Sequence, residues 1–138
     1  MKLSHVHLKV RDRDVSVPFY LQLFDLEVTE QVGGFAFLGD GKTHHVVALQ
    51  ELGEGAPAPA PFGVGLYHVA FEVETEEELR GFLARAEGLG LDPVLVDHGI
   101  SWAAYFPDPD GNGLEVFLDR RAVVGSTWVG RTRRLVLS

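Results

Sequence analysis

The sequence contains no cysteine, and this absence excludes several kinds of chemistry at once. Disulfides, thiolate zinc sites, iron–sulfur clusters and cysteine nucleophiles all need sulfur that this chain does not have. Any metal ion bound by this protein must therefore be held by nitrogen and oxygen atoms.

Long hydrophobic runs and an excess of basic side chains are missing as well. No stretch approaches the roughly 20 apolar residues of a membrane-spanning helix. The 12 Lys and Arg against 20 Asp and Glu give a formal net charge of −8, which argues against a nucleic-acid partner because phosphates require a basic face. Residues 1–5 lack the apolar segment of a signal peptide, so we expect no membrane partner and a cytoplasmic location.

The composition does favour a folded domain, and it is rich in histidine. With 138 residues and 46% hydrophobic side chains, the chain is long enough to bury a core and too apolar to be a disordered polyanion. A small basic cluster in the tail, Arg131, Arg133 and Arg134, predicts only a solvated strand face. The six histidines are His5, His7, His44, His45, His68 and His98.

An internal repeat organises the chain. Segments 38–48 and 108–118 both place an Asp-Gly turn two residues before a strand. Segments 3–10 and 66–73 both alternate as half-buried strands do. Each half therefore predicts the order βαβββ. The predicted helices cover about 14–25 and 75–88, and residues 75–78 (TEEE) form a capping box at the start of the second. The remaining predicted strands cover about 27–32, 35–39, 44–50, 93–97, 101–106 and 113–118.

This repeat predicts an α+β fold and a division of the chain into modules. We expect a single domain over residues 1–120, followed by a C-terminal extension over 121–138. Within the domain, module one spans 1–52, a Pro/Gly-rich linker spans 53–65, and module two spans 66–120. The first helix is expected to pack through Phe19, Leu23 and Leu26, with Pro18 tolerated near its first turn.

Strand parity indicates which polar side chains can converge, because successive side chains on a strand face opposite ways. His5 and His68 occupy equivalent slots on the face turned away from the helices, and Glu115 lies on the polar face of the last strand. The repeat alignment places His45 in the slot of Glu115 and turns His44 toward the helix as a structural residue.

Two histidines and one carboxylate on three strands suggest a facial triad that holds non-haem Fe(II). The same donors suit Mn, Zn or Ni, so the ligand set leaves the metal open. The alternative is that these histidines simply lie on a solvated strand face.

The sequence resembles the vicinal oxygen chelate superfamily, which includes glyoxalase I, fosfomycin and bleomycin resistance proteins, and type I extradiol (catechol 2,3-) dioxygenases. The resemblance covers about residues 1–120. It rests on HVHLKV at 5–10, FY at 19–20, YHVAF at 67–71 and DPDGNGLE at 108–115, in the family's order. It implies a glyoxalase-like fold, with the two modules forming a cupped, half-open barrel around a metal held by His5, His68 and Glu115.

Three further segments resemble the extradiol dioxygenases in particular. In THHVVAL (43–49) the match places the acid–base histidine at His45, where glyoxalase I has a fourth metal ligand. In DHGIS (97–101) His98 matches the histidine that contacts a catechol oxygen, and Tyr105 matches a tyrosine that hydrogen-bonds the substrate oxygen. Phe117, Trp102 and His7 could line the pocket.

The resemblance implies an Fe(II)-dependent extradiol dioxygenase of aromatic catabolism that cleaves a catechol-type substrate with O2, and that forms a homodimer. Two alternatives stay open. One is a glyoxalase-type isomerase or lyase using Zn, Ni or Mn, for which Lys9 and Lys42 are the obvious basic side chains to receive glutathione carboxylates. The other is a metal-free dimeric protein that binds a hydrophobic drug.

Overall fold

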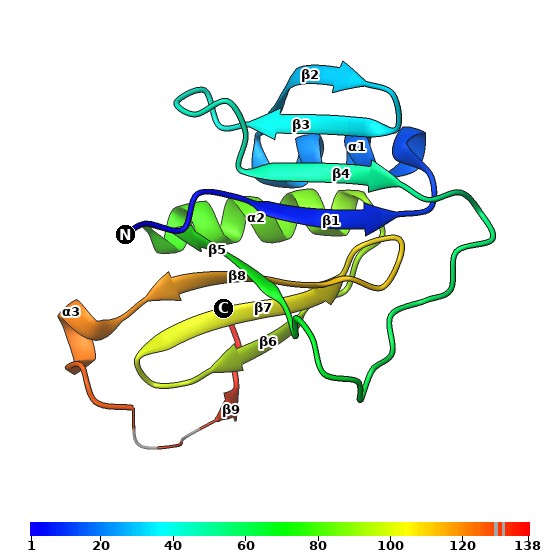
Figure 1. The fold of residues 1–138 in the computed structure, drawn as a ribbon. Helices are drawn as coiled ribbons and strands as arrows, with labels where there is room; N and C mark the ends of the chain where they lie inside the picture. Colours follow the sequence, from blue (N-terminus) through cyan, green and yellow to red (C-terminus); the bar gives the residue numbers. More distant parts are fainter. Residues whose placement is uncertain (129, 131) are drawn as a thin grey trace. The chain divides into compact units, whose positions relative to one another are not determined.

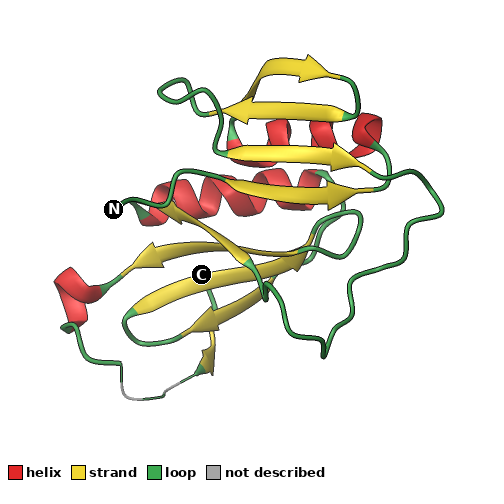
Figure 2. Cartoon of the chain, viewed as in Figure 1, coloured by secondary structure: helices red, strands yellow, loops and turns green. Residues whose placement is uncertain are grey.

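The computed structural model describes residues 1–128, 130 and 132–138, whose contacts form two compact units. Unit 1 comprises Met1–Val64 and Asp108–Asn112, and unit 2 comprises Gly65–Pro107 and Gly113–Ser138. Figures 1 and 2 show the helices and strands of the two units. The predicted module boundaries at residues 52, 65 and 120 remain predictions. No helix in the described residues is long and apolar enough to cross a membrane.

Unit 1 is a four-stranded sheet with one helix packed on it (Figure 1). The strand order is β1-β4-β3-β2, with β1 parallel to β4 and the other pairs antiparallel. The helix α1 contacts β3 and β4, and it covers the sheet face that carries the buried side chains Leu8 and Val10. Its elements are β1 (Val6–Val10), α1 (Arg13–Phe24), β2 (Glu27–Val32), β3 (Phe35–Gly39) and β4 (Val47–Glu51).

Unit 2 repeats this plan and extends it. Its sheet has the order β5-β8-β7-β6-β9, with β5 parallel to β8, and α2 contacts β5 and β8. The α+β class and the two βαβββ modules are therefore confirmed, as two separate sheets rather than one closed barrel. Its elements are β5 (Val69–Val73), α2 (Glu76–Gly88), β6 (Val94–Asp97), β7 (Ser101–Pro107), β8 (Gly113–Asp119), α3 (Arg121–Val124) and β9 (Arg133–Arg134).

Helix α1 begins at a side-chain cap, and of the predicted packing set it fully buries only Leu23. Asp12 accepts a hydrogen bond from the backbone N–H of Asp14, which satisfies one of the free donors of the first turn. The fully buried aromatic side chain is Tyr20, whereas Phe19 and Leu26 are only half-buried. Pro18 lies in the second turn rather than the first, on the exposed side of the helix.

Helix α2 carries the predicted cap. The hydroxyl of Thr75 accepts from the N–H of Glu78 at 3.1 Å, while the Glu78 carboxylate accepts from the N–H of Glu74 at 2.7 Å. The helix therefore starts where Thr75 and Glu78 predict, because both ends of the cap satisfy backbone donors.

The register of the parallel strand pairs corrects the predicted repeat alignment. Val6 pairs with Val47 in unit 1, and Val69 pairs with Leu114 in unit 2. The residue that follows Val47, Ala48, is therefore the counterpart of Glu115. The prediction that His45 occupies this slot is wrong, because the connection between β3 and β4 (residues 40–46) is longer than the one between β7 and β8 (108–112).

His44 and His45 consequently lie in the connection before β4, and strand parity does not apply to them. The prediction that His44 faces the helix is wrong: its side chain is 55% exposed and forms an ion pair with Glu30.

The tail adds one short strand to unit 2. In β9, Arg133 pairs with Asp97 and Arg134 pairs with Val96 of β6. Both arginines are exposed, as a solvated strand face predicts, and Arg131 of the same cluster lies outside the described residues.

Candidate metal and substrate site

In unit 1, two of the predicted site residues lie together at the start of the β1–β4 pair. The ring centroids of His5 and His45 are 4.3 Å apart, and the ring of His45 also contacts Phe37 at 5.1 Å. His7, which was expected to line the pocket, is exposed and packs edge-on against Phe35. The longer connection thus returns His45 to His5 without placing it on the strand.

The surroundings of His45 favour its neutral form. Burial, followed by the nearby His5, His44 and His7, lowers the pKa of His45 below its usual value of 6.5. The Nδ1 atom of His44 lies 2.9 Å from Nδ1 of His45, and its Nε2 lies 3.2 Å from the Glu30 carboxylate. A neutral imidazole here can accept a proton or bind a metal ion.

In unit 2, His68 and Glu115 are in direct contact. The Nε2 atom of His68 is 2.8 Å from Oε2 of Glu115, and Glu115 is only 8% exposed. Gly113 makes room for this approach, because a Cβ atom there would lie 2.3 Å from the carbonyl oxygen of Tyr67. A residue with a side chain at 113 would displace the segment that carries His68.

Tyr105 connects this pair to His98. The ring centroids of Tyr105 and His68 are 5.5 Å apart, and the Tyr105 hydroxyl lies 2.9 Å from Nε2 of His98. Burial, a hydrogen bond with Glu115 and the charge of Glu115 raise the pKa of Tyr105 to about 12. Tyr105 therefore stays protonated at neutral pH and can donate a hydrogen bond.

A tight turn between β6 and β7 aims His98 at Tyr105. The Asp97 carboxylate accepts from the N–H of Gly99 at 2.7 Å, and Gly99 has a φ of +81° that residues with side chains rarely adopt. The second ring nitrogen of His98, Nδ1, lies 3.4 Å from the hydroxyl of Thr132. The DHGIS segment thus has a local structural reason for its Asp and Gly, as well as a candidate role for its His.

His68, His98 and Tyr105 line a cavity of about 420 Å³. The volume is within the range of sites for small organic ligands. Thr132 was not expected from the sequence, since only the pairing of the tail with β6 brings it to the cavity. The lining includes His68, His98 and Tyr105 together with Tyr67, Val96 and Thr132.

The donors in unit 2 fit a divalent metal ion. Two ligands that bind one ion at about 2.1 Å, at right angles, are about 3 Å apart, and the His68–Glu115 separation is 2.8 Å. Nε2 of His68 is the nitrogen that faces Glu115, whereas Nδ1 is buried and has no hydrogen-bond partner in the described structure.

The predicted third ligand, His5, belongs to unit 1. Within either unit, the described residues include no group of three His, Asp or Glu side chains that could hold a metal ion by itself. The six predicted site residues thus fall into two sets, with His5 and His45 in unit 1. The set in unit 2 comprises His68, His98, Tyr105 and Glu115.

Two βαβββ modules, each a sheet covered by one helix, define a class of paired-module α+β proteins. The chain belongs to the Glyoxalase/Bleomycin resistance protein/Dioxygenase superfamily, whose family model matches residues 2–116. A solved structure of a glyoxylase/bleomycin resistance protein/dioxygenase domain from Frankia sp. EAN1pec is similar, with a TM-score of 0.73 and 28% identity over 87% of this chain and 98% of that one.

Two relatives represent different chemistries. Biphenyl-2,3-diol 1,2-dioxygenase 3 of Rhodococcus globerulus is 32% identical over 88% of this chain and 65% of its own length. A probable lactoylglutathione lyase of Vibrio cholerae is 27% identical over 90% of this chain and 95% of its own length. The chain therefore spans less than two thirds of the dioxygenase and nearly all of the lyase.

Proposed function

We propose that the protein is a metal-dependent extradiol dioxygenase that cleaves a catechol-type aromatic ring with O2. The observation that carries this proposal is the contact of His68 with the buried Glu115, next to a cavity that His68, Tyr105 and His98 line. The similarity to a diol dioxygenase supports the same chemistry.

His5, His68 and Glu115 would hold the ion, with Fe(II) as the first choice and Mn, Zn or Ni as alternatives. Such an ion supplies Lewis acidity and a template that brings the diol and O2 together. An all-nitrogen and oxygen ligand set with one carboxylate suits Fe(II), because this set leaves positions open for substrate.

His45 would take the proton that the substrate loses on binding and return it later in the reaction. Its ring contacts His5 and is half-buried, so it lies where a proton acceptor near the ion is required. The alternative role for His45 is that of a fourth metal ligand. Substitution of His45 should leave the metal content unchanged if it is the acid–base residue and lower the metal content if it is a ligand.

Tyr105 and His98 would bind and orient the substrate oxygens. The Tyr105 hydroxyl and His98 Nε2 are 2.9 Å apart, so a substrate oxygen can replace this contact with bonds to both groups. Donors positioned in this way stabilise the negative charge that develops on oxygen.

A glyoxalase-type lyase is the second candidate, because the lactoylglutathione lyase relative matches this chain almost from end to end. It predicts consumption of a glutathione hemithioacetal without O2 and binding of metal by His45. A metal-free drug-binding protein is the third and predicts no bound metal.

Pairing of two chains is also proposed. The segment from Phe62 to Leu66 exposes large apolar side chains, with Phe62 at 101%, Val64 at 112% and Leu66 at 70%. Exposed apolar side chains gathered in this way are typical of an interface. Sedimentation equilibrium of the wild type and of a Phe62→Ser, Val64→Ser variant tests this proposal; a monomeric wild type would contradict it.

The function is tested in two stages. Elemental analysis of protein purified without chelators first names the metal. The protein is then loaded with Fe(II) under anaerobic conditions and given catechol or 2,3-dihydroxybiphenyl, and oxygen uptake is recorded with the appearance of a yellow ring-cleavage product. Retained Fe(II) without oxygen uptake on any of these diols would contradict the proposal, and hemithioacetal turnover would support the lyase.

A further inference from the structure

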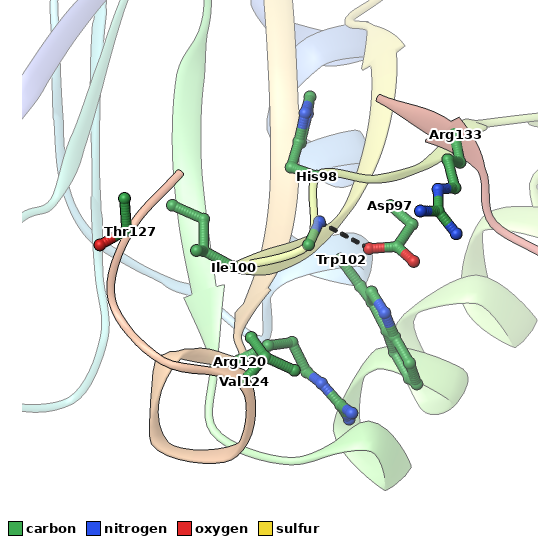
Figure 3. A pocket seen from close by; sticks show the side chains of 9 residues that line it. Asp97, His98, Ile100, Trp102, Arg120, Val124, Thr127 and Arg133 are labelled. Atoms are coloured by element: carbon green, nitrogen blue, oxygen red, sulfur yellow. Dashed lines mark hydrogen bonds between the residues drawn. The ribbon is translucent and has the colours of Figure 1, made fainter. Parts of the chain in front are cut away.

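Unit 2 contains a second cavity, of about 500 Å³, whose lining residues are drawn in Figure 3. His98 lines both this cavity and the 420 Å³ cavity that contains His68 and Tyr105. A ligand whose reacting end lies against Tyr105 can therefore extend past His98 into the second cavity.

Arg120 is the central cation of the second cavity. Its guanidinium carbon lies 4.1 Å from the centroid of the Trp102 ring, which holds the planar group in one orientation. Its backbone N–H donates to the carbonyl of Ile100 at 2.7 Å, which fixes the start of the side chain at the β6–β7 turn. The Nε atom of Arg120 is buried and has no hydrogen-bond partner in the described residues. An unpaired buried donor on a charged group is costly unless an acceptor reaches it.

Arg133 of β9 supplies a second cation to the cavity. It pairs with Asp97 across the β6–β9 pair, and both residues line the cavity. The Asp97 carboxylate already accepts a hydrogen bond from Gly99. Two guanidinium groups and one carboxylate leave the cavity with one net positive charge, in a protein whose net charge is −8.

We propose that this cavity binds the carboxylate of an aromatic monocarboxylate ligand through Arg120 and Arg133. The ring would lie against Trp102 and the apolar side chains of Ile100 and Val124, which also line the cavity. One net positive charge suits a monoanion better than a dianionic phosphate. That the ligand is a catechol carboxylate, with its diol at the metal, rests on the proposed function.

Binding is tested on the full chain after removal of metal, so that no ion can bind the probe. Calorimetric titration with benzoate is compared with phenol as the neutral probe. We expect benzoate to bind and to lose about 10- to 100-fold in affinity in Arg120→Met and in Arg133→Met. The matched controls are the sequence neighbours Arg121→Met and Arg134→Met, which do not line this cavity and should bind as the wild type does. Arg120→Lys should recover part of the affinity.

A second arm separates this inference from the proposed function. In Fe(II)-loaded protein, Arg120→Met should lower kcat/KM for dihydroxybenzoates and leave that for catechol unchanged. Benzoate binding that depends on Arg120 and Arg133, in a protein that cleaves no diol, would support the carboxylate site and overturn only the dioxygenase. Benzoate binding no tighter than phenol binding, or equal losses in all four Met variants, would overturn the carboxylate site. Circular dichroism of each variant shows that its fold is retained.

Discussion

The two modules share a backbone plan and differ in what that plan carries. His5 and His68 precede equivalent strands, since Val6 and Val69 pair with equivalent partners. The strands that pair with these two differ. β8 of the second module carries Glu115, and β4 of the first carries Ala48 at the equivalent position. A repeated fold therefore supplies one histidine twice and the carboxylate once, and these three residues are the proposed ligand set.

The β-hairpin turns differ as well. Asp108 in the second turn is buried, accepts the N–H groups of Asp110 and Asn112, and receives the Tyr20 hydroxyl at 2.7 Å. Asp40 in the first turn accepts N–H groups from Lys42 and Thr43 but is exposed. The two turns thus share a pattern of backbone hydrogen bonds to an aspartate. The Asp108 turn is also anchored by the buried hydrogen bond from Tyr20, whereas the Asp40 turn is exposed to solvent and is called the free turn below.

Removing the carboxylate that distinguishes the modules should have the largest effect. Glu115→Ala makes module two resemble module one at this slot, and we expect metal content to fall and turnover to drop by about a thousandfold or more, because several kcal/mol of metal stabilisation is lost. Metal analysis and oxygen uptake measure this. The control is Glu72→Ala, an exposed residue of β5. Wild-type metal content in Glu115→Ala would contradict the assignment.

The next prediction concerns the β3–β4 connection of module one, which is longer than its counterpart in module two and carries His44 and His45. His45→Gln should lower kcat by about 10²- to 10⁴-fold, as expected for the loss of an acid–base group, while metal content is retained. His44→Gln changes the adjacent ring, which contacts both Glu30 and His45, and should lower kcat far less than His45→Gln because His45 itself is kept. Loss of metal in His45→Gln would show a fourth ligand instead.

The hydroxyl at Tyr105 belongs to module two alone, since no tyrosine lies in β3. Tyr105→Phe keeps the ring beside His68 and removes the donor, so we expect kcat/KM to fall by about 10²-fold with unchanged metal content. Unchanged kinetics would make Tyr105 a packing residue. Steady-state kinetics on one diol decides between these outcomes.

The anchored turn should matter for stability. Tyr20→Phe removes a buried hydrogen bond to Asp108 and should lower the free energy of unfolding by about 1.5–3 kcal/mol. Urea denaturation measures the change. Tyr67 is 85% exposed, so the free energy of unfolding of Tyr67→Phe should stay within about 0.5 kcal/mol of the wild type. Equal effects of the two substitutions would contradict the buried role of Asp108.

The free turn should give the smallest effect, and one that depends on pH. Hydrogen bonds from Thr43 and Lys42 hold the pKa of Asp40 below its usual 3.8. A carboxyl group whose pKa is lower in the folded state stabilises the protein above its unfolded pKa and loses this contribution as pH falls through the folded value. The melting temperatures of wild type and Asp40→Ala should therefore differ slightly at pH 6 and converge below pH 3.8. A gap that widens on acidification would contradict this.

The sequence predicted most elements because the local signals were strong. Alternation defined β1 and β5, Thr75 and Glu78 defined the start of α2, and Asp-Gly turns defined both hairpins. The assignment of the chain to its superfamily from four short segments is confirmed by the family match over residues 2–116. The ligand set and the roles of His45, His98 and Tyr105 stay predictions.

The wrong predictions concerned the alignment of the two modules and the packing of α1. Both depend on loop length and on contacts distant in sequence, which a local pattern does not contain. The longer connection before β4 shifted the alignment of the two modules, so that Ala48 rather than His45 occupies the position equivalent to Glu115. Helix packing selected Tyr20 over Phe19, because only Tyr20 reaches Asp108 across 88 residues of chain.

By itself, the sequence determined the α+β class, the two-module order and an all-nitrogen and oxygen donor set, since composition, periodicity and the absence of cysteine are properties of the chain alone. Tertiary structure decided which donors meet. The contact of His68 with Glu115, the hydrogen bond between Tyr105 and His98, and the cavity beside Arg120 and Arg133 all depend on strand register and on the pairing of the tail with β6. Such long-range pairings follow from how the whole core packs, and no short segment encodes them.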